Sequence, residues 1–119
     1  MVSPVKFISI VILIVILDLP WLLVSSTFAS SMVRKIQGED LKLKVAPAIV
    51  VYIALAYLAL IPKTVLEAFL LGLSVYAVYD FTNLATLANY DWRFAVADSL
   101  WGGVLFVIVH YALDQMKGL

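Results

Sequence analysis

The sequence has 119 residues, of which 65% are hydrophobic and 13% are charged, with eight basic residues, eight acidic residues and no cysteine. Soluble domains are about 45–50% apolar and about 25% charged, so this composition excludes an ordinary soluble fold. It also excludes disorder and a disulfide-stapled scaffold. A net charge of zero leaves no basic surface for nucleic acid. We therefore expect an integral, multi-pass membrane protein in a lipid bilayer.

Four apolar stretches approach the length of about 20 residues that crosses a bilayer. They predict helices over residues 4–30, 45–61, 64–88 and 95–113. Continuous apolar runs favour helices over the alternating strands of a membrane barrel. The connections are short, so consecutive helices should be antiparallel neighbours. We predict a single transmembrane domain, residues 1–119, folded as an all-α up-down bundle of four transmembrane helices.

The basic residues indicate an orientation. In this topology both termini share one side with the second connection, and that side holds fewer lysines and arginines than the other. Cytoplasmic segments carry the excess of positive charge. The count therefore places the termini on the non-cytoplasmic side, with Lys6, Lys63 and Lys117 there and Arg34, Lys35, Lys42, Lys44 and Arg93 on the cytoplasmic side.

Three aspartates interrupt the predicted spans. Asp18 lies roughly 21 Å along the first helix and Asp80 roughly 24 Å along the third, at 1.5 Å per residue. Asp98 follows the third connection by about one turn. All three therefore fall at a similar depth near the same membrane side. A charged group at the centre of a span costs roughly 2.5–3.5 kcal/mol, so this convergence predicts a functional polar pocket.

Polar and aromatic side chains accompany these acids. The first and fourth helices both contain the pattern D-x-x-W, whose indole N–H can donate to a carboxylate while the ring shields the site from lipid. On the third helix, two tyrosines and an asparagine share an arc of about 100° with Asp80. The predicted binding pocket comprises Asp18, Trp21, Tyr76, Tyr79, Asp80, Asn83, Thr86, Asp98 and Trp101.

Each aspartate also has a structural interpretation. Asp98 could cap the N-terminus of the fourth helix. Asp80 could form an interhelical hydrogen bond that only holds the bundle together. Asp18 could extend to the connection or pair with Arg34 or Arg93.

Missing motifs narrow the chemistry. The sequence has no H-x-x-x-H, C-x-x-C, nucleophile elbow or phosphate-binding glycine loop. Its single histidine, His110, lies toward the other membrane side, which argues against a serine–histidine hydrolase and favours a structural role. Oxygen ligands suit a hard cation, with Asp18, Asp80 and Asp98 as candidate metal ligands. The same acids can carry protons. No other cofactor is expected.

Three motifs carry a family resemblance: L-D-L-P-W at residues 17–21, Y-D-F-T-N-L-A-T-L at 79–87 and D-S-L-W-G at 98–102. With these motifs the chain resembles a family of small four-helix membrane proteins of unknown function, found in bacteria with relatives in algae and large viruses. The resemblance spans nearly the whole chain and implies no established activity. The family-like positions are Asp18, Trp21, Tyr79, Asp80, Thr82, Asn83, Thr86, Asp98, Trp101 and Gly102.

The leading hypothesis is a non-enzymatic membrane protein whose aspartate cluster binds a cation, a proton or a small polar solute, in a transporter- or channel-like assembly. Four short helices enclose little volume, so we expect a homo-oligomer or a partner membrane protein. One alternative is an accessory or assembly subunit of a larger membrane complex. A second is a metal-dependent membrane enzyme that acts on a lipid.

Overall fold

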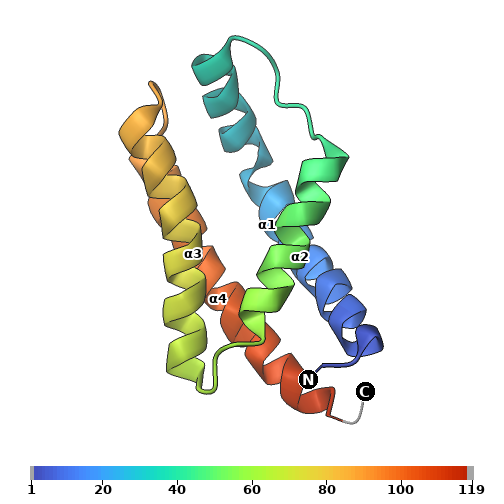
Figure 1. Ribbon diagram of the computed structural model, residues 1–119. Helices are drawn as coiled ribbons and strands as arrows, with labels where there is room; N and C mark the ends of the chain where they lie inside the picture. Colours follow the sequence, from blue (N-terminus) through green and yellow to red (C-terminus); the bar gives the residue numbers. More distant parts are fainter. Residues whose placement is uncertain (1, 118–119) are drawn as a thin grey trace.

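The computed structural model describes residues 2–117, and within them the chain forms four α-helices and no strand. The helices are α1 (Pro4–Gln37), α2 (Val45–Ala59), α3 (Val65–Thr86) and α4 (Trp92–Gln115). Figure 1 shows consecutive helices running in opposite directions, with both ends of the chain at the bottom and the α1–α2 and α3–α4 connections at the top. We call these the terminal end and the loop end. The predicted all-α membrane bundle is confirmed.

The helices differ in how they relate to a bilayer. Within the described residues, α1, α3 and α4 are long and apolar enough to cross a membrane. Helix α2 has 15 residues, about 22 Å at 1.5 Å per residue, against a hydrocarbon core of about 30 Å. In Figure 1 the α1–α2 connection descends before α2 begins, well below the top of α1. Three helices therefore have spanning length, and α2 is shorter.

Local capping sets the bounds of α1. The hydroxyl of Ser3 accepts from the backbone N–H of Lys6, and Pro4 occupies the first turn, where its missing N–H costs nothing. Gly38 ends the helix in the left-handed conformation, at φ 76°. The predicted end near residue 30 was too early, because loss of hydropathy alone does not stop a helix. The polar residues continue it to the glycine.

Helices α3 and α4 pack with their backbones in contact. A Cβ on Gly72 would overlap the carbonyl oxygen of Gly102. A Cβ on Gly102 would overlap the ring of Tyr76 and lie 2.7 Å from the carbonyl oxygen of Gly72. On α3 the contact line continues at every fourth residue, from Ala68 through Gly72 to Asp80. Small residues at such a crossing are the usual means by which membrane helices approach closely.

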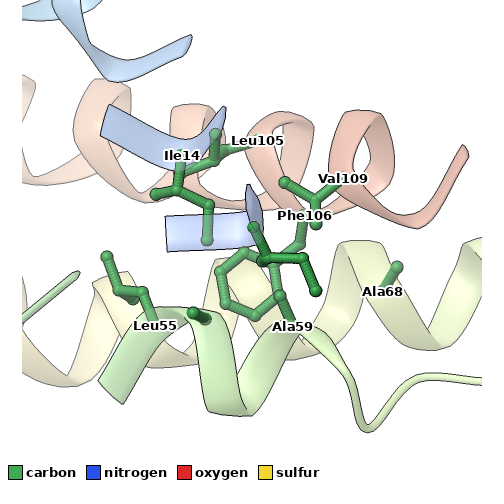
Figure 2. Packing of buried hydrophobic residues seen from close by; sticks show 9 residues of the cluster. Ile14, Leu55, Ala59, Ala68, Leu105, Phe106 and Val109 are labelled. Atoms are coloured by element: carbon green, nitrogen blue, oxygen red, sulfur yellow. The ribbon is translucent and has the colours of Figure 1, made fainter. Parts of the chain in front are cut away.

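The interior has two layers. Toward the terminal end, apolar side chains from all four helices fill the space between them (Figure 2). The three aspartates are also buried: Asp80 and Asp98 lie in the halves of α3 and α4 nearer the loop end, whereas Asp18 lies near the middle of α1, because that helix continues to Gln37. Leucine, isoleucine and valine side chains instead cover the outside, where lipid would contact them. The apolar layer comprises Ile10, Ile14, Leu55, Ala56, Ala59, Ala68, Leu105, Phe106 and Val109.

The substitution Gly72→Ala should destabilise the bundle by about 1–3 kcal/mol, because the added methyl group meets backbone that cannot move aside. Val78→Ile adds one carbon at a position of α3 that is 70% exposed and should have little effect. Unfolding by SDS in mixed micelles measures both. Equal stability of the two variants would contradict the close contact between α3 and α4.

Candidate functional site

Asp18 joins three helices. Its carboxylate accepts from the indole N–H of Trp101 on α4, at 2.9 Å, and from the hydroxyl of Tyr52 on α2, at 2.6 Å. The pairing with Arg34 or Arg93 considered from the sequence does not occur, because each arginine pairs with an acid of the connections. Asp18 therefore receives neutral donors inside the bundle.

Asp98 completes a crossed arrangement. Its Oδ1 accepts from the indole N–H of Trp21, at 2.7 Å. Each D-x-x-W pair thus donates its indole hydrogen to the carboxylate of the opposite helix. Because α1 and α4 run antiparallel, the acid of one helix lies level with the indole of the other. The indole rings of Trp21 and Trp101 stack on each other, with centroids 6.3 Å apart and an angle of 22° between their planes.

Asp98 does not cap α4. The helix begins at Trp92, and its N-cap is Asp91, whose carboxylate accepts from the backbone N–H of Arg93 at 2.8 Å. The capping interpretation of Asp98 is therefore wrong, because the helix starts three residues before the predicted residue 95. Asp98 lies almost two turns inside the helix and is buried.

Asp80 is the most enclosed of the acids, with 0% of its surface exposed. Its Oδ1 accepts from the hydroxyl of Tyr90 at 2.7 Å. Its carboxyl also lies within side-chain hydrogen-bonding reach of Asp98. Among the described residues, Oδ2 of Asp80 is buried without a hydrogen-bond donor. An unpaired buried acceptor is costly, so this atom marks the site at which the cluster is chemically incomplete.

The remaining predicted pocket residues separate into two groups. Tyr76 lies within electrostatic range of all three aspartates, and Asn83 lies beside the Tyr90 hydroxyl. By contrast, Tyr79 is 64% exposed, and Thr86 is exposed with its hydroxyl donating to a backbone carbonyl of its own helix. Tyr79 and Thr86 therefore do not line the cluster.

The placement of Tyr79 and Thr86 in the predicted pocket was wrong for a geometric reason. A straight helical arc of about 100° places Tyr79 on the same side as Asp80, with Thr86 just outside it, but the α3–α4 contact line advances by four residues at a time. Each step of four residues turns the contact face by about 40°, at 100° per residue. Near the loop end the inward face has therefore rotated away from these two side chains.

Two tyrosines of the cluster were not predicted. Tyr52 lies on the short helix α2, and Tyr90 lies in the α3–α4 connection. The sequence holds one signal for each: Tyr52 is one of two tyrosine hydroxyls in the apolar helix α2, and Tyr90 is an aromatic residue beside the charges at the loop end. Neither signal says which acid the hydroxyl meets.

The three aspartates named as candidate metal ligands are not gathered into one group. Across residues 2–117, no group of three or more His, Cys, Asp and Glu side chains is arranged to hold a metal ion. The physical reason is the crossed pairing, which directs Asp18 toward Tyr52 and Trp101 while Asp80 faces Asp98. The acids therefore act as one pair and one separate group.

An open hollow lies above the cluster at the loop end. It measures about 490 Å³ and is lined by Leu84, Asn89, Tyr90, Asp91, Trp92 and Arg93. Hydrogen bonds from Arg93 hold the pKa of the Asp91 carboxyl below its usual range, so this acid is ionised at the surface. Tyr90 belongs both to this hollow and to the buried cluster.

The family described as "Predicted membrane protein (DUF2177)" matches residues 4–112, which include every residue of the cluster. The chain belongs to this family. The predicted membership of a membrane-protein family of unknown function is thereby confirmed. No curated protein and no solved structure matches the chain.

A double-mutant cycle tests the crossed pairing. Trp21→Phe combined with Asp98→Asn should show a coupling free energy within the range of about 0.5–3 kcal/mol seen for residues in contact. The matched pair Trp21→Phe and Asp18→Asn, three residues apart on one helix, should couple more weakly. SDS unfolding in micelles measures both cycles. Stronger coupling within α1 than between α1 and α4 would contradict the crossed arrangement.

Proposed function

We propose that the protein reversibly binds a proton inside the membrane, between the carboxyls of Asp80 and Asp98. One observation carries this proposal: Oδ2 of Asp80 is buried without a hydrogen-bond donor. The carboxyl to which this oxygen belongs faces a second acid, Asp98. One proton shared by the two carboxyls would turn an acceptor facing an acceptor into a hydrogen bond. It would also remove one of two like charges from a medium that solvates them poorly.

Among the ligands considered from the sequence, a proton suits this geometry best. Asp18 already accepts from two neutral donors, and one oxygen of each remaining acid accepts from Trp21 or Tyr90. These donors are held by aromatic packing, in which Phe94 stacks on Trp21 and meets Tyr90 edge-on. A hard cation prefers six or more oxygen ligands, many more than the acid pair can supply. A proton needs only two.

The two-layer interior sets the side from which a proton would reach the pair. Below the acids, the buried side chains of the apolar layer are Ile, Leu, Ala, Phe and Val, none of which can carry a proton, while Tyr52 and Tyr76 pack against this layer and His110 follows its member Val109. Above them, Tyr90 leads to the hollow at the loop end. A single chain therefore supports uptake and release at the loop end, which is cytoplasmic in the predicted orientation. We propose that a transport cycle would require a second copy or a partner chain.

Infrared spectroscopy of the protein in lipid bilayers tests the proposal. A protonated carboxyl gives a carbonyl stretching band distinct from that of a carboxylate, and the wild type should show this band at neutral pH. Asp80→Asn should abolish it, because the remaining acid then has no carboxyl partner. Asp114→Asn, which changes a largely exposed acid near the terminal end, should leave the band unchanged.

Three outcomes would contradict the proposal. The band could be absent from the wild type, or it could persist in both Asp80→Asn and Asp98→Asn. The third contradicting outcome concerns association: the Asp80→Asn variant keeps its helices and its carboxyl band but no longer associates with a membrane complex that co-purifies with the wild type. That last result would favour the accessory-subunit alternative.

A further inference from the structure

The hydroxyl of Tyr90 links the surface hollow to the acid pair. It lies in the connection between α3 and α4, where it lines the hollow of about 490 Å³. Its hydroxyl donates to Oδ1 of the fully buried Asp80 at 2.7 Å. The other oxygen of the same carboxyl is the one without a donor. A proton that moved between the hollow and the pair would therefore pass this side chain.

The connection that carries Tyr90 is fixed to α1. The preceding residue, Asn89, adopts the left-handed conformation at φ 66°, and its side-chain amide donates to the carbonyl of Lys35 at 3.2 Å. The following residue, Asp91, directs its backbone N–H to the sulfur of Met32 at 3.3 Å. These contacts on both sides hold the tyrosine between the hollow and the acid. The ring also rests edge-on against Phe94.

The chemistry of the phenol suits transfer of a proton. A tyrosine hydroxyl donates one hydrogen and accepts on its oxygen, so it can give its proton to Asp80 while it receives another from the hollow. Burial, followed by the hydrogen bond to Asp80, raises the pKa of Tyr90 well above its usual range. The side chain therefore remains a neutral donor at physiological pH and would pass protons along without resting as a phenolate.

We propose that Tyr90 is the gate through which the Asp80–Asp98 pair exchanges its proton with the loop-end hollow. This inference rests on the proposed proton-binding function. It adds a specific route and makes a tyrosine outside the helices the residue that sets the rate of exchange. Tyr90 positions and relays the proton, while the two acids hold it.

Hydrogen–deuterium exchange of the carboxyl separates this role from the function itself. The wild type in bilayers is switched from H₂O to D₂O, and the shift of the protonated carboxyl band is followed in time. Tyr90→Phe should keep the band but slow its exchange at least about tenfold, because the ring remains and the hydroxyl is lost. The control Tyr57→Phe, on a tyrosine of α2 that is 63% exposed, should exchange at the wild-type rate.

A second variant guards against an effect of packing. Tyr90→His restores a group that can donate and accept, so exchange should recover at least in part. Equal slowing in the Phe and His variants would overturn the gate, since the shape of the side chain would then set the rate.

The failures of the two proposals are distinguishable. A wild type without a band that depends on Asp80 would overturn both proposals. A band that depends on Asp80 but exchanges in Tyr90→Phe as fast as in the wild type, or faster, would overturn the gate alone. In that case proton binding by the acid pair would stand.

Discussion

The crossed hydrogen bonds between the two D-x-x-W pairs are the constraint on which the rest of the site depends. Among the described residues, α1 packs on α2 and α4 but makes no comparable contact with α3. Its position on the α3–α4 pair is therefore set largely through α4. A shift of α1 by one residue along α4 would displace both indoles from their carboxylates at once. In a medium without water, the loss of an indole donor from each of two buried acids is costly, so the two bonds together fix one register.

A second constraint brings the acid pair together. Gly72 and Gly102 allow the backbones of α3 and α4 to touch, which brings together the side chains that follow about two turns along α3 from Gly72 and about one turn along α4 from Gly102, toward the loop end. Asp80 and Asp98 are those side chains. Close packing and the acid pair are thus two results of one arrangement: the glycines that stabilise the crossing also oppose two like charges. The proton that we propose the pair shares would relieve that opposition without any change in helix positions.

The sequence correctly predicted features that depend only on position along the chain. Hydropathy gave the membrane environment, and the rise per residue gave the shared depth of the three aspartates. Predictions from the sequence were wrong where they depended on which way a side chain points around the helix axis. Tyr79 and Thr86 lie on the outer side because the contact face of α3 turns along its length. Asp98 was open to interpretation as a cap only because the start of α4 was placed three residues too late.

Other features depended on contacts between segments distant in the chain. Tyr52 and Tyr90 reach their acids from a short helix and from a connection, and the pairing of Trp21 with Asp98 spans 77 residues. The sequence by itself determined that the chain belongs in a bilayer and that Asp80 and Asp98 lie toward the loop end, because composition and axial rise do not depend on packing. Only the tertiary structure decided which indole meets which carboxylate, that Asp80 and Asp98 form the pair, and that Tyr90 connects them to the surface. Those choices follow from helix rotation and crossing, which the closest backbone contacts set.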